Sequence, residues 1–128
     1  MAISKEERKV LLKAQQGELD AVKMYNALAK TVTEEKDAAL FLQLAAEEGR
    51  HAAVFKAITG EVLKPESTKA ILLPALYRVI GRKRLYPMIA KGEYDAEKKY
   101  RSVAARFSEV ESVKNDEHRH GDMIMSLL

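Results

Sequence analysis

Two nine-residue segments of the chain are nearly the same, and each carries a glutamate and a tyrosine seven residues apart. Residues 17–25 read GELDAVKMY and residues 92–100 read GEYDAEKKY, with six of nine positions identical. A second pair of segments reads EEGRH at 47–51 and DEHRH at 116–120, so each contains Glu-x-x-His. The chain therefore reads as two copies of one unit. Each copy supplies one glutamate followed by a Glu-x-x-His pair.

The repeated acidic and imidazole side chains are of the kind that bind divalent metals. Carboxylate and imidazole ligands suit iron, manganese or zinc, and residues three apart lie on one face of a helix. Four carboxylates buried together would repel one another and lose their hydration, but two divalent cations would neutralise them. The candidate metal ligands are Glu18, Glu48, His51, Glu93, Glu117 and His120.

Each part of this pattern also has an ordinary interpretation. A single Glu-x-x-His pair on a helix is usually solvated, and Tyr25 and Tyr100 would ordinarily be core aromatics. Glu18, however, shares a helical face with apolar residues and is expected to point into the core. The recurrence of all three ligand positions in the same order favours a metal site over a metal-free bundle. A duplicated unit that has lost its site is the alternative.

The elements that must position these residues are helices, since strand-type alternation is scarce. Ser4 and Glu7 form a capping box that opens a helix over residues 4–31. Thr31 and Thr33 are candidate caps for a second helix, which is expected to stop near Gly60.

The second half of the chain repeats this arrangement after a connection at residues 60–68. A short helix that starts near Pro74 and ends at Gly81 is expected to follow that connection. A long helix is predicted over 84–107, with Pro87 in its first turn, where proline is tolerated. Ser108 and Glu111 make a second capping box, which opens a helix that runs to about residue 126.

These elements predict an all-α fold of four long helices with a short extra helix in a long crossover between the second and third. The 128 residues suit a single domain over 1–128. Within it, the hairpin repeat covers 4–59 and 84–126.

Composition narrows the classes of function. The chain has no cysteine, which excludes disulfides, thiolate metal sites and iron–sulfur clusters within it. The net charge of +3 is weak evidence for nucleic acid, and we expect none as a partner. A local basic cluster reads as a solvated turn; it comprises Arg78, Arg82, Lys83 and Arg84.

No apolar run approaches the ~18 residues of a membrane span, and the polar N-terminus is not a signal peptide. We therefore expect a cytoplasmic protein that does not engage membranes.

The ligand pattern resembles that of the ferritin-like di-iron proteins, and most of all the rubrerythrin group. It is also similar to the ferritin-like domains of vacuolar-iron-transporter-type proteins. The resemblance covers nearly the whole chain and implies a ferritin-like four-helix bundle that holds two Fe ions. It implies that Glu48 and Glu117 bridge the ions, that Glu18 and Glu93 are terminal ligands, and that each ion has one histidine.

The chain departs from the rubrerythrin pattern in two ways. Rubrerythrins have a further carboxylate three residues after the third-helix glutamate, where this chain has Ala96. Glu97 is the candidate replacement as a seventh ligand. Rubrerythrins also carry a rubredoxin domain with a cysteine-bound iron, which this chain lacks, so an external electron-donor protein is expected.

The resemblance implies a di-iron oxidoreductase that reduces peroxide or dioxygen as Fe(II) is oxidised. Peroxidase and ferroxidase activities both fit, and manganese or zinc could replace iron. Tyr25 and Tyr100 could hydrogen-bond the ligand carboxylates. The family also suggests a homo-oligomer. Two alternatives stay open: an iron-binding or iron-delivery module that docks on a partner or a membrane surface, and a di-iron hydroxylase.

Overall fold

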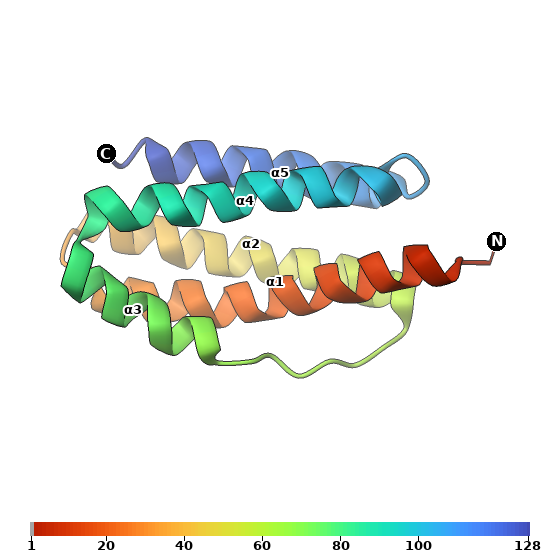
Figure 1. The fold of residues 1–128 in the computed structure, drawn as a ribbon, viewed down its shortest axis with the longest axis horizontal. Coiled ribbons are helices and arrows are strands. Elements are labelled where there is room, and N and C mark those ends of the chain that lie inside the picture. The colour runs from red at the N-terminus through yellow and green to blue at the C-terminus, as the bar shows by residue number, and fades with distance from the viewer. Residues whose placement is uncertain (1) are drawn as a thin grey trace.

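Every regular element of the structure is an α-helix. The computed structural model describes residues 2–128 and contains no strand among them. Two hairpins lie side by side, α1 packed on α2 and α4 packed on α5 (Figure 1). This confirms the predicted all-α bundle of four long helices with a short helix in the crossover. The helices are α1 (Lys5–Thr31), α2 (Glu35–Thr59), α3 (Thr68–Ile80), α4 (Arg82–Ala104) and α5 (Ser108–Met125).

The two strongest helix-end signals in the first hairpin are confirmed. The backbone N–H of Glu7 donates to the Ser4 hydroxyl at 3.1 Å, and the N–H of Ser4 donates to the Glu7 carboxylate at 2.9 Å. At the other end of the hairpin, α2 stops at Gly60, whose φ of 71° is left-handed and whose N–H bonds to Lys56. A glycine adopts this conformation without steric penalty.

The other predicted caps are wrong. The hydroxyl of Thr31 bonds to the α1 carbonyl four residues earlier, and the N–H of Thr33 donates to Tyr77 in α3. Glu34 is therefore the N-cap of α2, without a side-chain hydrogen bond. Ser108 is the first helical residue of α5 and makes no capping box.

Pro74 and Pro87 both lie further inside their helices than predicted. The short helix α3 begins at Thr68, six residues before Pro74, and α4 begins at Arg82, so Pro87 falls in its second turn. A helix interior normally disfavours proline. In α3 this preference is outweighed by apolar contacts with the core on one helical face, made by Leu73, Leu76, Tyr77 and Ile80.

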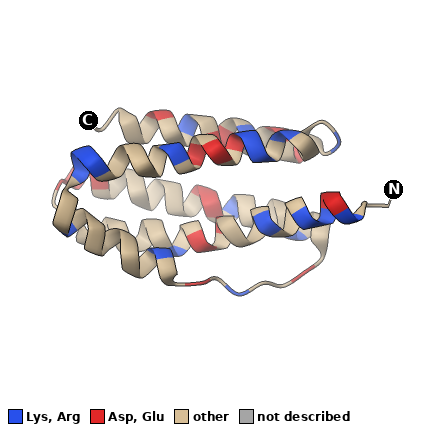
Figure 2. Cartoon of the chain, in the orientation of Figure 1, with Lys and Arg blue, Asp and Glu red and all other residues tan. Residues whose placement is uncertain are grey.

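The apolar core is divided into two clusters, one towards each end of the bundle. One cluster includes residues 24–28 of α1 and 85–90 of α4; the other includes residues 11–14 of α1 and 100–104 of α4. Between them, acidic segments of α1, α2 and α4 come level with one another in the middle of the bundle (Figure 2). The fold therefore places buried polar residues between two apolar layers.

An ion pair between a buried carboxylate and a half-buried arginine joins the helices at the end of the bundle away from this polar layer. Asp37 of α2 is fully buried and accepts two hydrogen bonds from Arg82 of α4, both 2.9 Å long. The Tyr86 hydroxyl donates to the same carboxylate at 2.6 Å, and Arg82 also reaches the carbonyl of Leu127 at 2.7 Å. The sequence had indicated that Arg82 belongs to a solvated basic turn. This prediction is wrong for Arg82, which is paired with Asp37.

Asp37→Ala is expected to lower the free energy of unfolding by about 3 kcal/mol, because it leaves Arg82 without its buried partner. Urea denaturation followed by circular dichroism measures this loss. Asp95→Ala is the matched control, since Asp95 pairs with Lys91 at the surface (2.8 Å) and such pairs add little stability. A loss for Asp37→Ala no larger than that of the control would contradict the structural role of this pair.

Candidate metal centre

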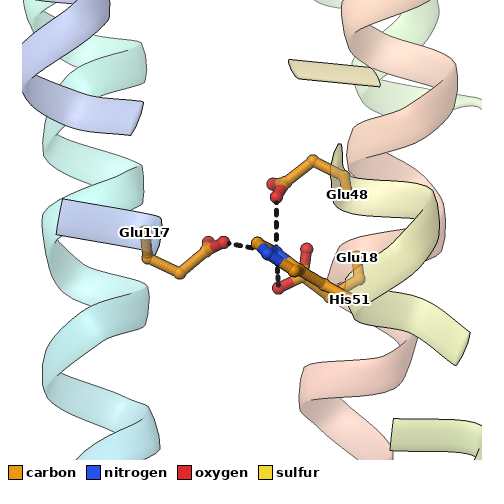
Figure 3. Close-up of side chains that lie close together, drawn as sticks. All are labelled: Glu18, Glu48, His51 and Glu117. Carbon is orange, nitrogen blue, oxygen red and sulfur yellow. Dashed lines mark hydrogen bonds and ion pairs between the residues drawn. The ribbon is translucent and has the colours of Figure 1, made fainter. Parts of the chain in front are cut away.

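The structure brings the six predicted ligand residues into one buried cluster in the middle of the bundle. The cluster consists of two overlapping groups, and the ligand atoms of each group lie within 4.8 Å of one another. Glu48 and Glu117 belong to both groups. The first group, drawn in Figure 3, is Glu18, Glu48, His51 and Glu117, and the second is Glu48, Glu93, Glu117 and His120.

Each hairpin supplies half of the cluster through the same positions of its repeat. In the first hairpin, Glu48 and His51 are three residues apart on α2, so both project towards the second hairpin. Glu117 projects from α5 towards His51 (Figure 3), and the two atoms His51 Nδ1 and Glu117 Oε1 are 3.0 Å apart. The internal repeat of the sequence is therefore a structural repeat, with the cluster between its two copies.

Both imidazoles present Nδ1 to the cluster and Nε2 to a carboxylate outside it. His51 Nδ1 is 3.0 Å from Glu48, and its Nε2 is 2.8 Å from Asp116. His120 Nδ1 is 3.3 Å from Glu48, and its Nε2 is 2.9 Å from Glu47. A carboxylate that accepts the Nε2 proton leaves the Nδ1 lone pair for a metal and fixes the orientation of the ring.

Sequence reasoning missed Glu47 and Asp116, although a signal for them was present. An acidic residue precedes the Glu-x-x-His glutamate in both copies, as EEGRH and DEHRH. The side chain of Arg119 bonds to both carboxylates. Burial by itself would raise the pKa of Glu47, but hydrogen bonds from His120, Gln43 and Arg119 lower it to about 2. Glu47 therefore stays charged opposite the imidazole.

The two repeat tyrosines hold the cluster glutamates across the hairpins. The Tyr100 hydroxyl on α4 donates to Glu18 on α1 at 3.0 Å, and the Tyr25 hydroxyl on α1 donates to Glu93 on α4. Burial, together with the nearby carboxylates, raises the pKa of both tyrosines well above the usual value. Both phenols therefore remain donors, and the predicted hydrogen bonds to the glutamates are present.

Glu97 lies outside the cluster. Its carboxylate accepts hydrogen bonds from Arg101 at 3.1 Å and pairs with His118 at 3.2 Å, at the surface of the second hairpin. His118 is exposed. Glu97 therefore belongs to neither of the two groups that could hold a metal.

Several polar atoms of the cluster make no hydrogen bond within the described residues. They are Glu18 Oε2, Glu93 Oε2, Glu117 Oε1 and His120 Nδ1. Buried polar atoms normally have partners, and these four all belong to candidate ligands. Oxygen and nitrogen donors of this kind are what a divalent transition metal requires, so the side chains fit a metal site.

The charge of the cluster leads to the same conclusion. Burial, and then the charge of Glu48, raise the pKa of Glu18 to about 8, and burial raises that of Glu117 well above its usual value. Although burial opposes it, the adjacent imidazoles of His120 and His51 lower the pKa of Glu48 to about 2. Without metal, the negative charge of the cluster can be balanced only if some of its glutamates keep their protons. Metal ions would displace those protons.

Comparison with known proteins agrees with this geometry. The model of the rubrerythrin family matches residues 9–128, which contain all six cluster residues. No curated protein and no solved structure gives a significant match. No helix among the described residues is long and apolar enough to cross a membrane. The family model and the buried cluster together indicate a metal site in a ferritin-like bundle, and the chain belongs to the rubrerythrin family.

Proposed function

We propose that this chain is a di-iron oxidoreductase that reduces peroxide with electrons from Fe(II). The observation that carries the proposal is the overlap of the two four-residue groups, which share Glu48 and Glu117. Two ions that share two carboxylates need this arrangement, since each bridging side chain must reach both ions. The rubrerythrin family match supports iron as the metal.

In this proposal each ion has a terminal glutamate and one histidine. Glu18 and His51 would hold one ion, Glu93 and His120 would hold the other, and Glu48 and Glu117, which belong to both groups, would be shared. Two ferrous ions would supply one electron each, and hard carboxylate ligands stabilise the ferric state that results.

The other residues of the site keep this ligand set in place. Tyr25 and Tyr100 each donate to a terminal glutamate of the opposite hairpin, which limits how far those carboxylates can swing. Glu47 and Asp116 hold the two imidazoles with Nδ1 facing inwards. Apolar clusters lie on both sides of the site, so the metal charge would be balanced mainly by protein carboxylates. The chain has no cysteine for a second redox iron, so the reducing electrons would come from another protein.

Protein purified without added metal is expected to contain about two iron ions per chain, measured by mass spectrometry of the metals. Glu48→Ala and Glu117→Ala are each expected to lose both ions together, because each glutamate belongs to both groups. Glu97→Ala is the matched control, since it removes a carboxylate outside the cluster and keeps both ions. Retention of both ions in Glu48→Ala, with the control unchanged, would show that Glu48 does not bridge.

Stopped-flow mixing of the Fe(II)-loaded protein with hydrogen peroxide or with dioxygen tests the reaction itself. Peroxide needs two electrons to become water, which two ferrous ions supply at once, whereas dioxygen needs four. We therefore expect oxidation by peroxide to be at least about tenfold faster, a difference in barrier of about 1.4 kcal/mol. Equal rates, or faster oxidation by dioxygen, would instead support a ferroxidase.

A second candidate function is an iron-delivery module, because α3 exposes large apolar side chains to solvent. Ile71 is 72% exposed and Val79 is 80% exposed, and the basic residues Arg78 and Lys83 are exposed close to them in sequence. Such a surface suits docking on a partner or an anionic membrane. The stopped-flow measurement separates this candidate, since a delivery module would retain Fe(II) in the presence of peroxide.

A further inference from the structure

A cavity of about 680 Å³ lies between α1, α3 and α4 and reaches the cluster carboxylates. Glu18, Glu93 and Glu117 lie on its inner surface and are buried. A water-sized molecule needs only about 15 Å³ of such space, whereas drug-sized ligands occupy cavities of about 300–1,000 Å³. The cavity is therefore far larger than hydrogen peroxide or dioxygen requires.

Two glycines keep this cavity open beside the cluster. Gly17 and Gly92 occupy the same position in the two copies of the repeat, immediately before Glu18 and Glu93, and both line the cavity. A Cβ atom built on either glycine has no atom within 4 Å. Side chains at these positions would project into open space, so their absence leaves room for a ligand next to the carboxylates.

The hydrogen bonds between α1 and α4 show which residues of the two helices face each other across the cavity. Tyr100 lies opposite Glu18, and Tyr25 lies opposite Glu93. The two helices therefore run in opposite directions along the cavity, as Figure 1 shows. Residues before Glu18 on α1 consequently share one end of the cavity with residues after Glu93 on α4.

The end that these segments share is basic. Lys13 on α1 and Lys99 on α4 both line the cavity and are exposed. Neither forms an ion pair with any residue of the described chain, 2–128. Lys13 precedes Glu18 by five residues, which places it roughly 8 Å from the carboxylates along the helix axis. Two unpaired ammonium groups at the mouth favour an anionic group on the ligand.

The opposite end of the cavity lies under α3, which contributes Lys69 to the lining but otherwise apolar side chains. Met24 on α1 and Ile89 on α4 are buried there, and Leu73 and Leu76 of α3 cover them. Met24 follows Glu18 by six residues, or roughly 9 Å along the helix axis. A ligand that fills the whole cavity would thus have an anionic head, a hydrocarbon tail, and its middle beside the cluster.

From this arrangement we propose that the cavity binds a long-chain fatty acid that carries a hydroperoxide group on its chain. Lys13 and Lys99 bind the carboxylate, the tail lies under α3, and the peroxide group lies beside Glu18 and Glu93. This names the substrate class of the proposed peroxidase and rests on that function. In the reaction the O–O bond breaks: one oxygen stays on carbon as an alcohol and the other leaves as water. Two electrons from the two ferrous ions and two protons from solvent balance it.

Binding of a fatty acid without a peroxide group tests the cavity apart from the reaction. Isothermal titration calorimetry of the protein as purified compares laurate with dodecyltrimethylammonium, which has the same tail and a cationic head, both below their micelle concentrations. We expect laurate to bind at least about tenfold more tightly, because two ammonium groups attract its carboxylate. Equal affinity for the two amphiphiles would overturn the proposal.

Two variants locate the site. Lys13→Ala/Lys99→Ala is expected to weaken laurate binding about tenfold, whereas the control Lys9→Ala/Lys98→Ala removes exposed lysines of the same helices that do not line the cavity. Gly92→Leu fills the cavity and is expected to abolish laurate binding while both metal ions remain. Unchanged laurate binding in either test variant would overturn the proposal.

The failure of this inference can be distinguished from failure of the proposed function. Iron content is measured on the same protein samples as laurate binding. Two iron ions without laurate binding would overturn the fatty-acid site and leave the di-iron peroxidase intact. Specific laurate binding by a protein that takes up no iron would overturn the peroxidase, and with it the hydroperoxide as substrate.

Discussion

The structure depends on one electrostatic constraint: four carboxylates are buried between two apolar clusters, where they cannot all be ionised without positive charge beside them. Glu18 and Glu117 respond with raised pKa values, whereas the two adjacent imidazoles lower the pKa of Glu48 and keep it ionised. An arrangement of this kind destabilises a protein unless cations or protons neutralise it. The fold is thus organised around a site whose charge two metal ions would balance.

This constraint also explains why several polar contacts of the site cross between the hairpins. Tyr25 bonds to Glu93 and Tyr100 to Glu18, while His51 reaches Asp116. The helices pack most extensively within each hairpin, α1 with α2 and α4 with α5. The polar cluster therefore adds to the apolar contacts that join the two copies of the repeat, and a metal would strengthen that connection.

The sequence predicted the six cluster residues because their spacing is a local property of helices and because it occurs twice. Contacts that depend on the placement of the other hairpin were not predictable in the same way. Glu47 and Asp116 each lie one residue from a ligand, hence on a neighbouring helical face, and only the opposite hairpin brings a histidine to them. Arg82 was misread as solvated because its partner Asp37 lies 45 residues away. Glu97 had the right chemistry, but its helical position points it to the surface, where it binds Arg101.

The most direct test of this account is a crystal structure of the iron-loaded protein with anomalous diffraction data collected at the iron absorption edge. The account predicts two anomalous peaks inside the bundle, one bonded to His51 Nδ1 and the other to His120 Nδ1, with Glu48 and Glu117 contacting both. A single peak, or two peaks that share no carboxylate, would contradict a dinuclear site built from the two copies of the repeat.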